Sequence, residues 1–380
     1  MDLPEVVDGL GGRSPDVESV PSGSKPEKMS ARKCPEREPV AIHSENGEIR
    51  PLNVVMSPKS PVAQAYARRA CEAEASTAPV MSDGFRVLPK WDLVHFGGKT
   101  IADLVFVNRY VGGEGAWDRR DIQNIDAALA AAMSDSRLQS VIAQYYPSPI
   151  TSRMLEPSRV VPGYVPPRFF KDDAEELASR LFLGGDLDES DPEQSVINLM
   201  LPRGVVLVDG FSPSFRPPPG MEEENGRRRR ALIKVDDDES DSTHGLGGYH
   251  GSVHVNRNGQ DVTVYYAVGV FSEGDNGIAV FDGANGAWQN VVATFYHELN
   301  EARTDPDVED AIRLNDVSKI GWYSPGGNGE IGDLPIKEVE SAPRPDIGRV
   351  FTTVPLEQGS GGVPIQLMWS NKAHAPALSL

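Results

Sequence analysis

A histidine and two glutamates in the last third of the chain have the spacing of a metal site. The run is His297-Glu298-Leu299-Asn300-Glu301, which differs at one position from the HExxH motif of zinc peptidases. Side chains four apart lie on one face of a helix, so His297 and Glu301 could hold one ion, and zinc accepts carboxylate as well as imidazole ligands. Glu298 would take a proton from a water as the general base.

The residues around this run predict a helix over 285–303. It should end at Asp305-Pro306, because the residue before a proline avoids the α region. The apolar residues at helical spacing, which form the predicted core face, are Trp288, Val291, Val292, Phe295, Leu299 and Ala302. His297 and Glu301 lie on the other side, among small or polar residues. That side suits a metal site on the floor of a cleft, and equally an ordinary solvated helix face.

Two further parts of the chain offer a third ligand. Glu330 and Asp333 belong to the glycine-rich run 329–333, where they are either site residues or ordinary turn residues. His250 lies on a predicted strand. It is a ligand, a group that stabilises a substrate oxyanion, or a buried structural histidine.

Two aspartates follow the predicted helix. Asp305 fits a helix end or a turn. Asp307 stands ten residues after His297, where some zinc peptidases place their third histidine ligand. Both are therefore candidates, and each has a simple structural explanation beside the functional one.

The composition restricts the class of protein. The chain has 380 residues and a net charge of −19, which disfavours nucleic acids and anionic membranes as partners. No apolar run approaches the ~20 residues that span a bilayer. The N-terminus lacks the basic and apolar regions of a secretory signal, so we expect a cytoplasmic protein or export by a non-Sec route. Only Cys34 and Cys71 occur, so no disulfide framework is predicted.

The chain divides into a leader and a folded domain. Residues 1–80 are rich in Pro, Ser, Glu and Gly, and predict a mostly disordered leader. Residues 81–380 predict one domain. Within it, residues 212–247 carry blocks of Pro, Glu, Arg and Asp, and predict a low-complexity insertion that forms a mobile loop.

The rest of the domain predicts both helices and strands. Helices are expected at 118–133 and 171–182, and residues 134–146 fit either a helix or a strand. Strands are expected at 101–107, 195–200, 204–209, 249–256, 262–271, 277–281, 349–354 and 364–369. The strands at 249–256 and 262–271 should form a hairpin, because Asn258-Gly259 favours a tight turn between them.

Several short motifs occur in a characteristic order. They are Gly248-Tyr249-His250-Gly251, the HExxE helix with its Asp-Pro end, Glu330-Ile331-Gly332-Asp333, and Gln366-Leu367-Met368-Trp369-Ser370-Asn371. Together they resemble the EXORDIUM, or phosphate-induced, protein family of plants and its bacterial and fungal relatives, over roughly residues 85–375. Two features depart from that pattern. The relatives are typically secreted, and a cysteine often follows the Glu-Ile-Gly-Asp loop where this chain has Leu334-Pro335.

The resemblance implies an α+β fold: one zincin-like domain with a mixed sheet and a central metal-site helix. It implies a zinc-dependent hydrolase, most simply a peptidase acting on peptide or protein substrates. From the spacing of the residues together with this resemblance, we expect His297, Glu301 and Glu330 to be the zinc ligands, and Glu298 and His250 to be the catalytic residues. Asp333 and Asp305 are expected to orient the ligands.

Two alternatives stay open from the sequence. Glu301 in place of a histidine adds negative charge, so Ca²⁺ is a second candidate ion. The chain could also be a non-catalytic interaction protein on the same scaffold, with a structural or vestigial metal site. The sequence leaves the substrate and the oligomeric state open.

Overall fold

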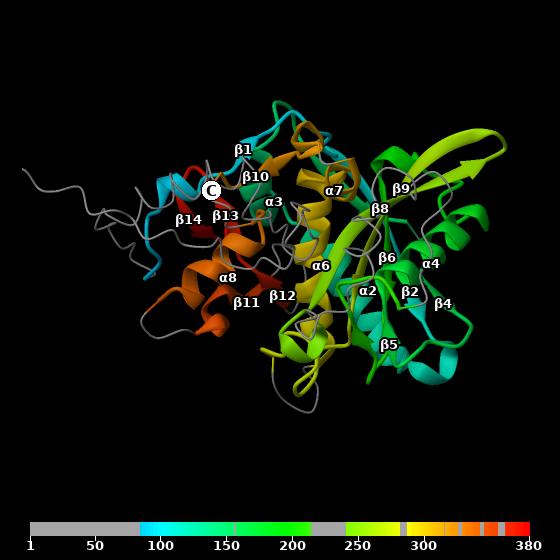
Figure 1. The fold of residues 1–380 in the computed structure, drawn as a ribbon. Helices are drawn as coiled ribbons and strands as arrows, with labels where there is room; N and C mark the ends of the chain where they lie inside the picture. Colours follow the sequence, from blue (N-terminus) through cyan, green and yellow to red (C-terminus); the bar gives the residue numbers. More distant parts are fainter. Residues whose placement is uncertain are drawn as a thin grey trace, which may run out of the picture. The chain divides into compact units, whose positions relative to one another are not determined.

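A six-stranded mixed β-sheet forms the centre of the fold (Figure 1). The computed structural model describes residues 84–155, 157–213, 241–281, 287–314, 316–325, 329–342, 346–355 and 362–380. The predicted leader and most of the predicted insertion lie outside these ranges. The fold is α+β with a mixed sheet, as predicted.

The sheet has the order β3–β2–β6–β9–β8, and β4 also pairs with β2. Its strands are β2 (Asp103–Val111), β3 (Thr151–Met154), β4 (Arg159–Val161), β6 (Ser195–Met200), β8 (Gly248–Arg257) and β9 (Gln260–Gly269). All pairs are parallel except β8 with β9, which is antiparallel. The hairpin prediction is confirmed: Asn258 and Gly259 have φ angles of 56° and 84°, as a tight two-residue turn requires.

Helices pack on both faces of this sheet. Helix α4 (Lys171–Leu183) packs on one face, and α2 (Arg119–Ser134) and α6 (Ala287–Thr304) pack on the other. Strand β9 has the expected alternation. Tyr265 and Ala267 join the apolar cluster of α2 and α6, whereas Tyr266 and Val268 join the cluster of α4. The helices predicted at 118–133 and 171–182 are confirmed, and the ambiguous segment 134–146 contains a helix, α3 (Ser136–Ala143).

Smaller elements complete the described part of the chain. The remaining helices are α7 (Val308–Leu314) and α8 (Asp333–Glu340). The two-stranded pairs are β1 (Val94–His95) with β10 (Trp322–Tyr323), β5 (Arg168–Phe169) with β7 (Val206–Leu207), β11 (Phe351–Pro355) with β12 (Gly362–Gln366), and β13 (Met368–Ser370) with β14 (Ala375–Ala377). Short 3₁₀ helices are η1 (Pro89–Trp91), η2 (Glu114–Ala116), η3 (Pro192–Gln194), η4 (Ser242–His244), η5 (Val317–Lys319) and η6 (Ile347–Val350).

Helix α6 lies between the sheet and the C-terminal elements (Figure 1). Every residue from Asn290 to Thr304 is buried, so the side that carries His297 is covered as well as the apolar side. The solvated-face interpretation of this helix is therefore wrong, because β12 and the segment before α8 cover that side. Among the described helices, none has the length and apolar composition that crossing a membrane requires.

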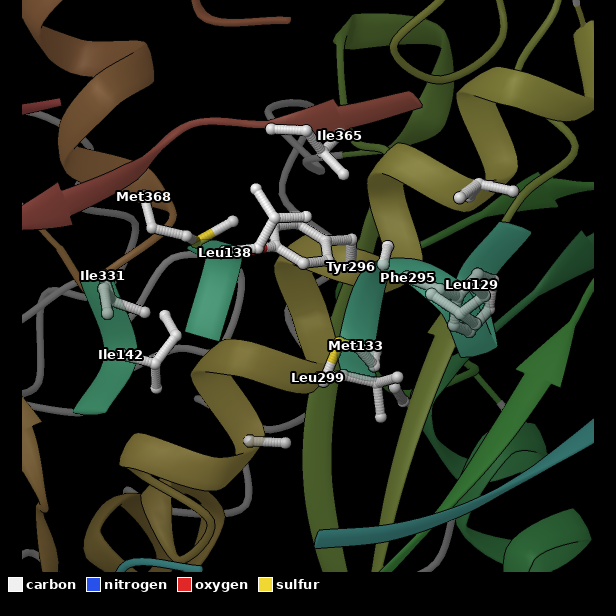
Figure 2. Close-up of a cluster of buried hydrophobic side chains, with 14 of the residues drawn as sticks. Leu129, Met133, Leu138, Ile142, Phe295, Tyr296, Leu299, Ile331, Ile365 and Met368 are labelled. Atoms are coloured by element: carbon white, nitrogen blue, oxygen red, sulfur yellow. The ribbon is translucent and has the colours of Figure 1, made fainter. Parts of the chain in front are cut away.

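An apolar cluster holds α6 in place (Figure 2). Its labelled side chains come from α2, α3, α6 and the C-terminal segments: Leu129, Met133, Leu138, Ile142, Phe295, Tyr296, Leu299, Ile331, Ile365 and Met368. Ile331 is fully buried there, although it lies within the predicted glycine-rich loop. Its burial anchors the polar residues on either side of it.

Three sequence predictions differ from the structure. The predicted strand at 277–281 is irregular, because Asn290 Oδ1 accepts the backbone N–H groups of Val280 and Phe281 in place of a strand partner. The strand at 204–209 shortens to β7. Residues 241–247, assigned to the mobile insertion, are folded: Ser242 is buried and its hydroxyl accepts the N–H of Leu207.

Candidate metal centre

The sheet brings His250 to the buried helix. On β8, Tyr249 packs into the apolar cluster of α4, so the next side chain points to the opposite face, toward α6. His250 Nδ1 lies 3.6 Å from Glu298 Oε2 and 3.8 Å from Glu301 Oε2. The ligand atoms of these three residues all lie within 4.8 Å of one another, which is close enough to hold one metal ion.

A second group of three contains the other histidine. His297 Nε2 lies 3.0 Å from Glu301 Oε2 and 3.9 Å from Asp333 Oδ1. These ligand atoms also lie within 4.8 Å of one another. The structure thus brings Asp333 to His297 and Glu301, whereas Glu330 was the predicted third ligand. Glu330 lies beside the other histidine instead, with its Oε1 3.7 Å from His250 Nε2.

The turn before α8 fits closely against α6. The N–H of Gly332 donates to Glu301 Oε1 at 3.1 Å, which leaves Oε2 facing both histidines. A Cβ atom on Gly332 would lie 2.6 Å from His297 Nδ1, so a glycine is needed for this approach. The N–H of Glu330 donates to Asp333 Oδ2 at 3.1 Å and fixes that carboxylate.

Gln366 of β12 orients the imidazole of His297. Its Nε2 donates to the carbonyl of Gly332, so its Oε1 is the free acceptor. His297 Nδ1 lies 2.9 Å from that oxygen and therefore carries the proton that is donated. The other ring nitrogen, Nε2, faces Glu301 and Asp333, as in a metal-binding histidine whose second nitrogen is hydrogen-bonded.

His250 is oriented in the same manner. Its Nε2 lies 3.1 Å from the backbone carbonyl of Asp305, and a carbonyl can only accept, so Nε2 is the donor. Its Nδ1 is left facing Glu298 and Glu301. The Asp305 side chain accepts the N–H of Gly321 at 2.8 Å, which fixes the segment that holds His250.

Five carboxylates surround these two histidines. They are Glu298, Glu301, Asp305, Glu330 and Asp333, each 3% exposed or less. Within the described ranges, none of the five pairs with a lysine or arginine. Both oxygens of Glu330, Oε2 of Glu298 and Oδ1 of Asp333 also lack a hydrogen-bond partner there. Because unpaired buried charge is costly, this cluster needs protons or a cation to neutralise it.

The pKa values in the cluster reflect this crowding. Burial alone would lower the pKa of His297, but Glu301 and Glu298 outweigh it and raise that pKa well above its ordinary value. Burial raises the pKa of Glu330 and of Asp333 far above the usual range, and the charge of Glu301 adds to both shifts. Burial also raises the pKa of Asp305, to about 7. Protons therefore neutralise the metal-free cluster, and a divalent cation would compete with them.

A small cavity reaches the cluster from the side of β8. Its volume is about 30 Å³, and its lining includes Gly247, Gly248, Thr294, His297 and Glu298. One water needs roughly 10–15 Å³ of such space, so the cavity accommodates a water beside Glu298. Ile278, Ile336 and Phe351 give the same cavity an apolar side.

The donor set fits a transition-metal ion. Two imidazole nitrogens beside carboxylates suit zinc, whereas calcium takes oxygen ligands almost entirely. The unpaired buried oxygens of Glu298, Glu330 and Asp333 also fit a cation. Glycine at 332 leaves the room that the imidazole of His297 needs at this position.

Sequence reasoning proposed one residue that lies outside the site, Asp307, and missed one residue that belongs to it, Gln366. Asp307 accepts the Tyr265 hydroxyl at 2.8 Å and belongs to neither group of three. Gln366 received no role from the sequence, although it holds His297. The sequence offers one indication of this role: Gln366 is a polar residue within the apolar segment Val363 to Met368. In the structure its side chain is buried.

Comparisons with protein-family models, with curated proteins and with solved structures find no match to this chain. The resemblance to the EXORDIUM family therefore rests on the motifs themselves.

Proposed function

We propose that this protein is a zinc-dependent hydrolase with a zincin-like fold that cleaves peptide bonds. One observation carries the proposal: His297 Nε2, Glu301 Oε2 and Asp333 Oδ1 converge beside Glu298, which lines a cavity with room for water. The HExxE spacing and the resemblance to the EXORDIUM family support a peptide or protein as the substrate.

The residues of the chain have separate roles in this reaction. His297, Glu301 and Asp333 hold the ion, and Gln366 holds the imidazole. Bound zinc supplies a Lewis acid that polarises the substrate carbonyl and makes water more acidic. Glu298 takes a proton from water while the water oxygen adds to the carbonyl carbon. Glu298 then returns that proton to the amine nitrogen as the C–N bond breaks.

The environment of Glu298 suits a group that both takes and returns a proton. Its Oε1 lies on the side of Gly248, where a Cβ would come within 3.2 Å of it. Burial raises the pKa of Glu298 above its ordinary value, which moves it toward neutrality. Its other oxygen, Oε2, lies 3.6 Å from Nδ1 of His250.

The test combines metal content with activity. Elemental mass spectrometry of the full chain, purified without a chelator, should find zinc that is lost in the His297→Ala/Glu301→Ala double variant. Hydrolysis of a fluorogenic peptide library should be ~10²–10⁴-fold slower for Glu298→Gln, which retains zinc at His297. Glu189→Gln, on an exposed turn, is the matched control and should behave as the wild type. Full activity of Glu298→Gln, or no zinc after resupply, would overturn the proposal.

A structural metal site on a non-catalytic protein is the second candidate. The complete burial of the ligands and the small volume of the cavity favour it. In that case zinc removal lowers the melting temperature, while the zinc-loaded wild type hydrolyses no peptide in the library.

A further inference from the structure

We infer that His250, Glu298 and Glu301 hold a second divalent cation beside the first, with the Glu301 carboxylate shared by both ions. The inference rests on the proposed function, because Glu301 also belongs to the proposed zinc site. It adds a binding site on β8 and turns a mononuclear centre into a dinuclear one.

Glu301 has one carboxylate oxygen within reach of both histidines. Its Oε1 is used by the N–H of Gly332, so Oε2 is the oxygen that faces the cluster. That oxygen lies 3.0 Å from His297 Nε2 and 3.8 Å from His250 Nδ1. One carboxylate oxygen thus lies within 4 Å of a ring nitrogen of each imidazole, as a ligand shared by two ions requires.

His250 is oriented so that its Nδ1 faces two carboxylates. Because Nε2 donates to the Asp305 carbonyl, neutral His250 directs the lone pair of Nδ1 at the oxygens of Glu298 and Glu301. A lone pair facing carboxylate oxygens is repulsive unless a proton or a cation lies between them. The same arrangement recurs at His297, where Gln366 replaces the carbonyl. Each histidine therefore donates one ring N–H to a fixed acceptor and directs its other ring nitrogen at the carboxylates, so each can bind one ion.

Glu298 provides a separate oxygen for the second ion. Its Oε2 is buried, lies 3.6 Å from His250 Nδ1, and has no hydrogen-bond partner in the described part of the chain. Its Oε1 faces Gly248 at the cavity. One oxygen can therefore bind the ion while the other exchanges a proton, so the role as general base is retained.

The charge of the cluster also favours two cations over one. The five buried carboxylates face two histidines, and none of them forms an ion pair with a lysine or arginine of the described residues; Lys337 acts on Asp333 only from beyond ion-pair distance. One divalent ion leaves most of that negative charge unbalanced, whereas two nearly balance it. Both oxygens of Glu330 are unpaired and fully buried close to His250, where a second ion would bring positive charge.

The expected ligand is a first-row divalent ion such as Zn²⁺ or Mn²⁺, because each group of three mixes one imidazole with two carboxylates. In a peptide hydrolase, a second ion held here would add positive charge beside the water oxygen that attacks and the carbonyl oxygen that becomes negative, while Glu298 still returns the proton to the leaving amine nitrogen. Binding of the second ion would thus explain why a histidine lies at position 250 of β8 in the proposed hydrolase.

The test is the zinc stoichiometry of matched variants. Each full-length protein is dialysed to equilibrium against buffered Zn²⁺ and analysed by elemental and native mass spectrometry. We expect about two ions for the wild type, and about one for Glu298→Gln and for His250→Gln. The Gln at 250 retains a donor for the Asp305 carbonyl and removes only Nδ1, so folding is preserved. His254→Gln, on the same strand but bonded to Asp310, should keep two ions.

The outcomes separate this inference from the proposed function. A wild type that saturates at one ion overturns the second site and leaves the hydrolase proposal standing. No bound zinc overturns both. A second ion that persists in both the Glu298→Gln and His250→Gln variants lies elsewhere and also overturns the inference. Electron paramagnetic resonance of the Mn²⁺-loaded protein adds an independent readout: a spin-coupled pair supports a shared Glu301, and two isolated signals contradict it.

Discussion

His297 Nδ1 on α6 lies 2.9 Å from Oε1 of Gln366 on β12, a residue 69 positions further along the chain. This hydrogen bond joins α6 to β12. It also fixes the proton on Nδ1, so that Nε2 is the ring nitrogen that faces the carboxylates. The candidate centre is therefore built from two sides. The sheet provides His250, and the C-terminal segment provides Gln366, Asp333 and Glu330.

Replacing Gln366 should weaken metal binding with little change in the helix itself. In Gln366→Leu the acceptor for His297 Nδ1 is lost, so the imidazole is free to change its tautomer or rotate. Loss of such an orienting contact typically costs ~10–100-fold in metal affinity. A zinc titration with a competing chelator measures this. Gln123→Leu, on the exposed side of α2, should leave the affinity unchanged. Equal affinities for Gln366→Leu and the wild type would contradict the orienting role.

A methyl group at position 332 should displace His297. In Gly332→Ala the new Cβ would lie 2.6 Å from His297 Nδ1, well inside van der Waals contact, so the ring or the turn must shift. We expect the zinc affinity to fall by at least ~10-fold. Gly115→Ala is the control, because a Cβ there meets no other atom within 4 Å. Retention of wild-type affinity in Gly332→Ala would show that the turn moves without disturbing the ligand.

Arg303 should stabilise the fold independently of the metal. It is fully buried and donates to the carbonyls of Ala102 and Thr151 and to the Ser152 hydroxyl, which ties the end of α6 to β3 and to the residue before β2. Arg303→Met leaves these acceptors unpaired, at a cost of about 3 kcal/mol in the free energy of unfolding. Urea unfolding of the metal-free protein measures it. The exposed Arg120→Met should change stability by less than ~0.5 kcal/mol, and a similarly small effect at Arg303 would refute the prediction.

The metal-free protein should lose stability as the pH rises. The raised pKa of Glu330 means that the folded state binds this proton more tightly than the unfolded chain. Its contribution is complete below the unfolded pKa of 4.5 and is lost as the pH rises toward the folded value. Asp333 and His297 have raised pKa values too and act in the same direction.

Glu330→Gln isolates this effect, because an amide resembles the protonated acid at every pH. The stability of this variant relative to the wild type should increase between roughly pH 5 and pH 8 in the absence of metal. Saturating zinc should reduce the trend, since the cation replaces the protons. Chemical unfolding at several pH values gives the difference directly, and a difference that falls with pH would reverse the assigned sign.

Much of the fold follows from local patterns. Strand β6 has the predicted bounds, 195–200, because a short run of branched apolar residues suits a strand that is buried on both faces. Helices α2 and α4 follow from apolar periodicity and capping residues, and the β8–β9 hairpin follows from Asn258-Gly259. The strand predicted at 277–281 is wrong, because the side chain of Asn290 accepts the backbone N–H groups that a neighbouring strand would otherwise accept.

The candidate site likewise has one part that a local pattern predicts and another part that depends on tertiary packing. The spacing of His297, Glu298 and Glu301 is a property of one helix, and 3.6 residues per turn place them together wherever that helix lies. The groups that face them come from distant segments. Whether Asp333 or Glu330 meets His297, and which nitrogen of His250 points inward, depends on how β8, β12 and the turn before α8 pack around α6. Such contacts depend on the burial of the whole core, which involves residues far apart in the chain. They produce no periodic pattern in the local sequence, so sequence reasoning cannot predict them.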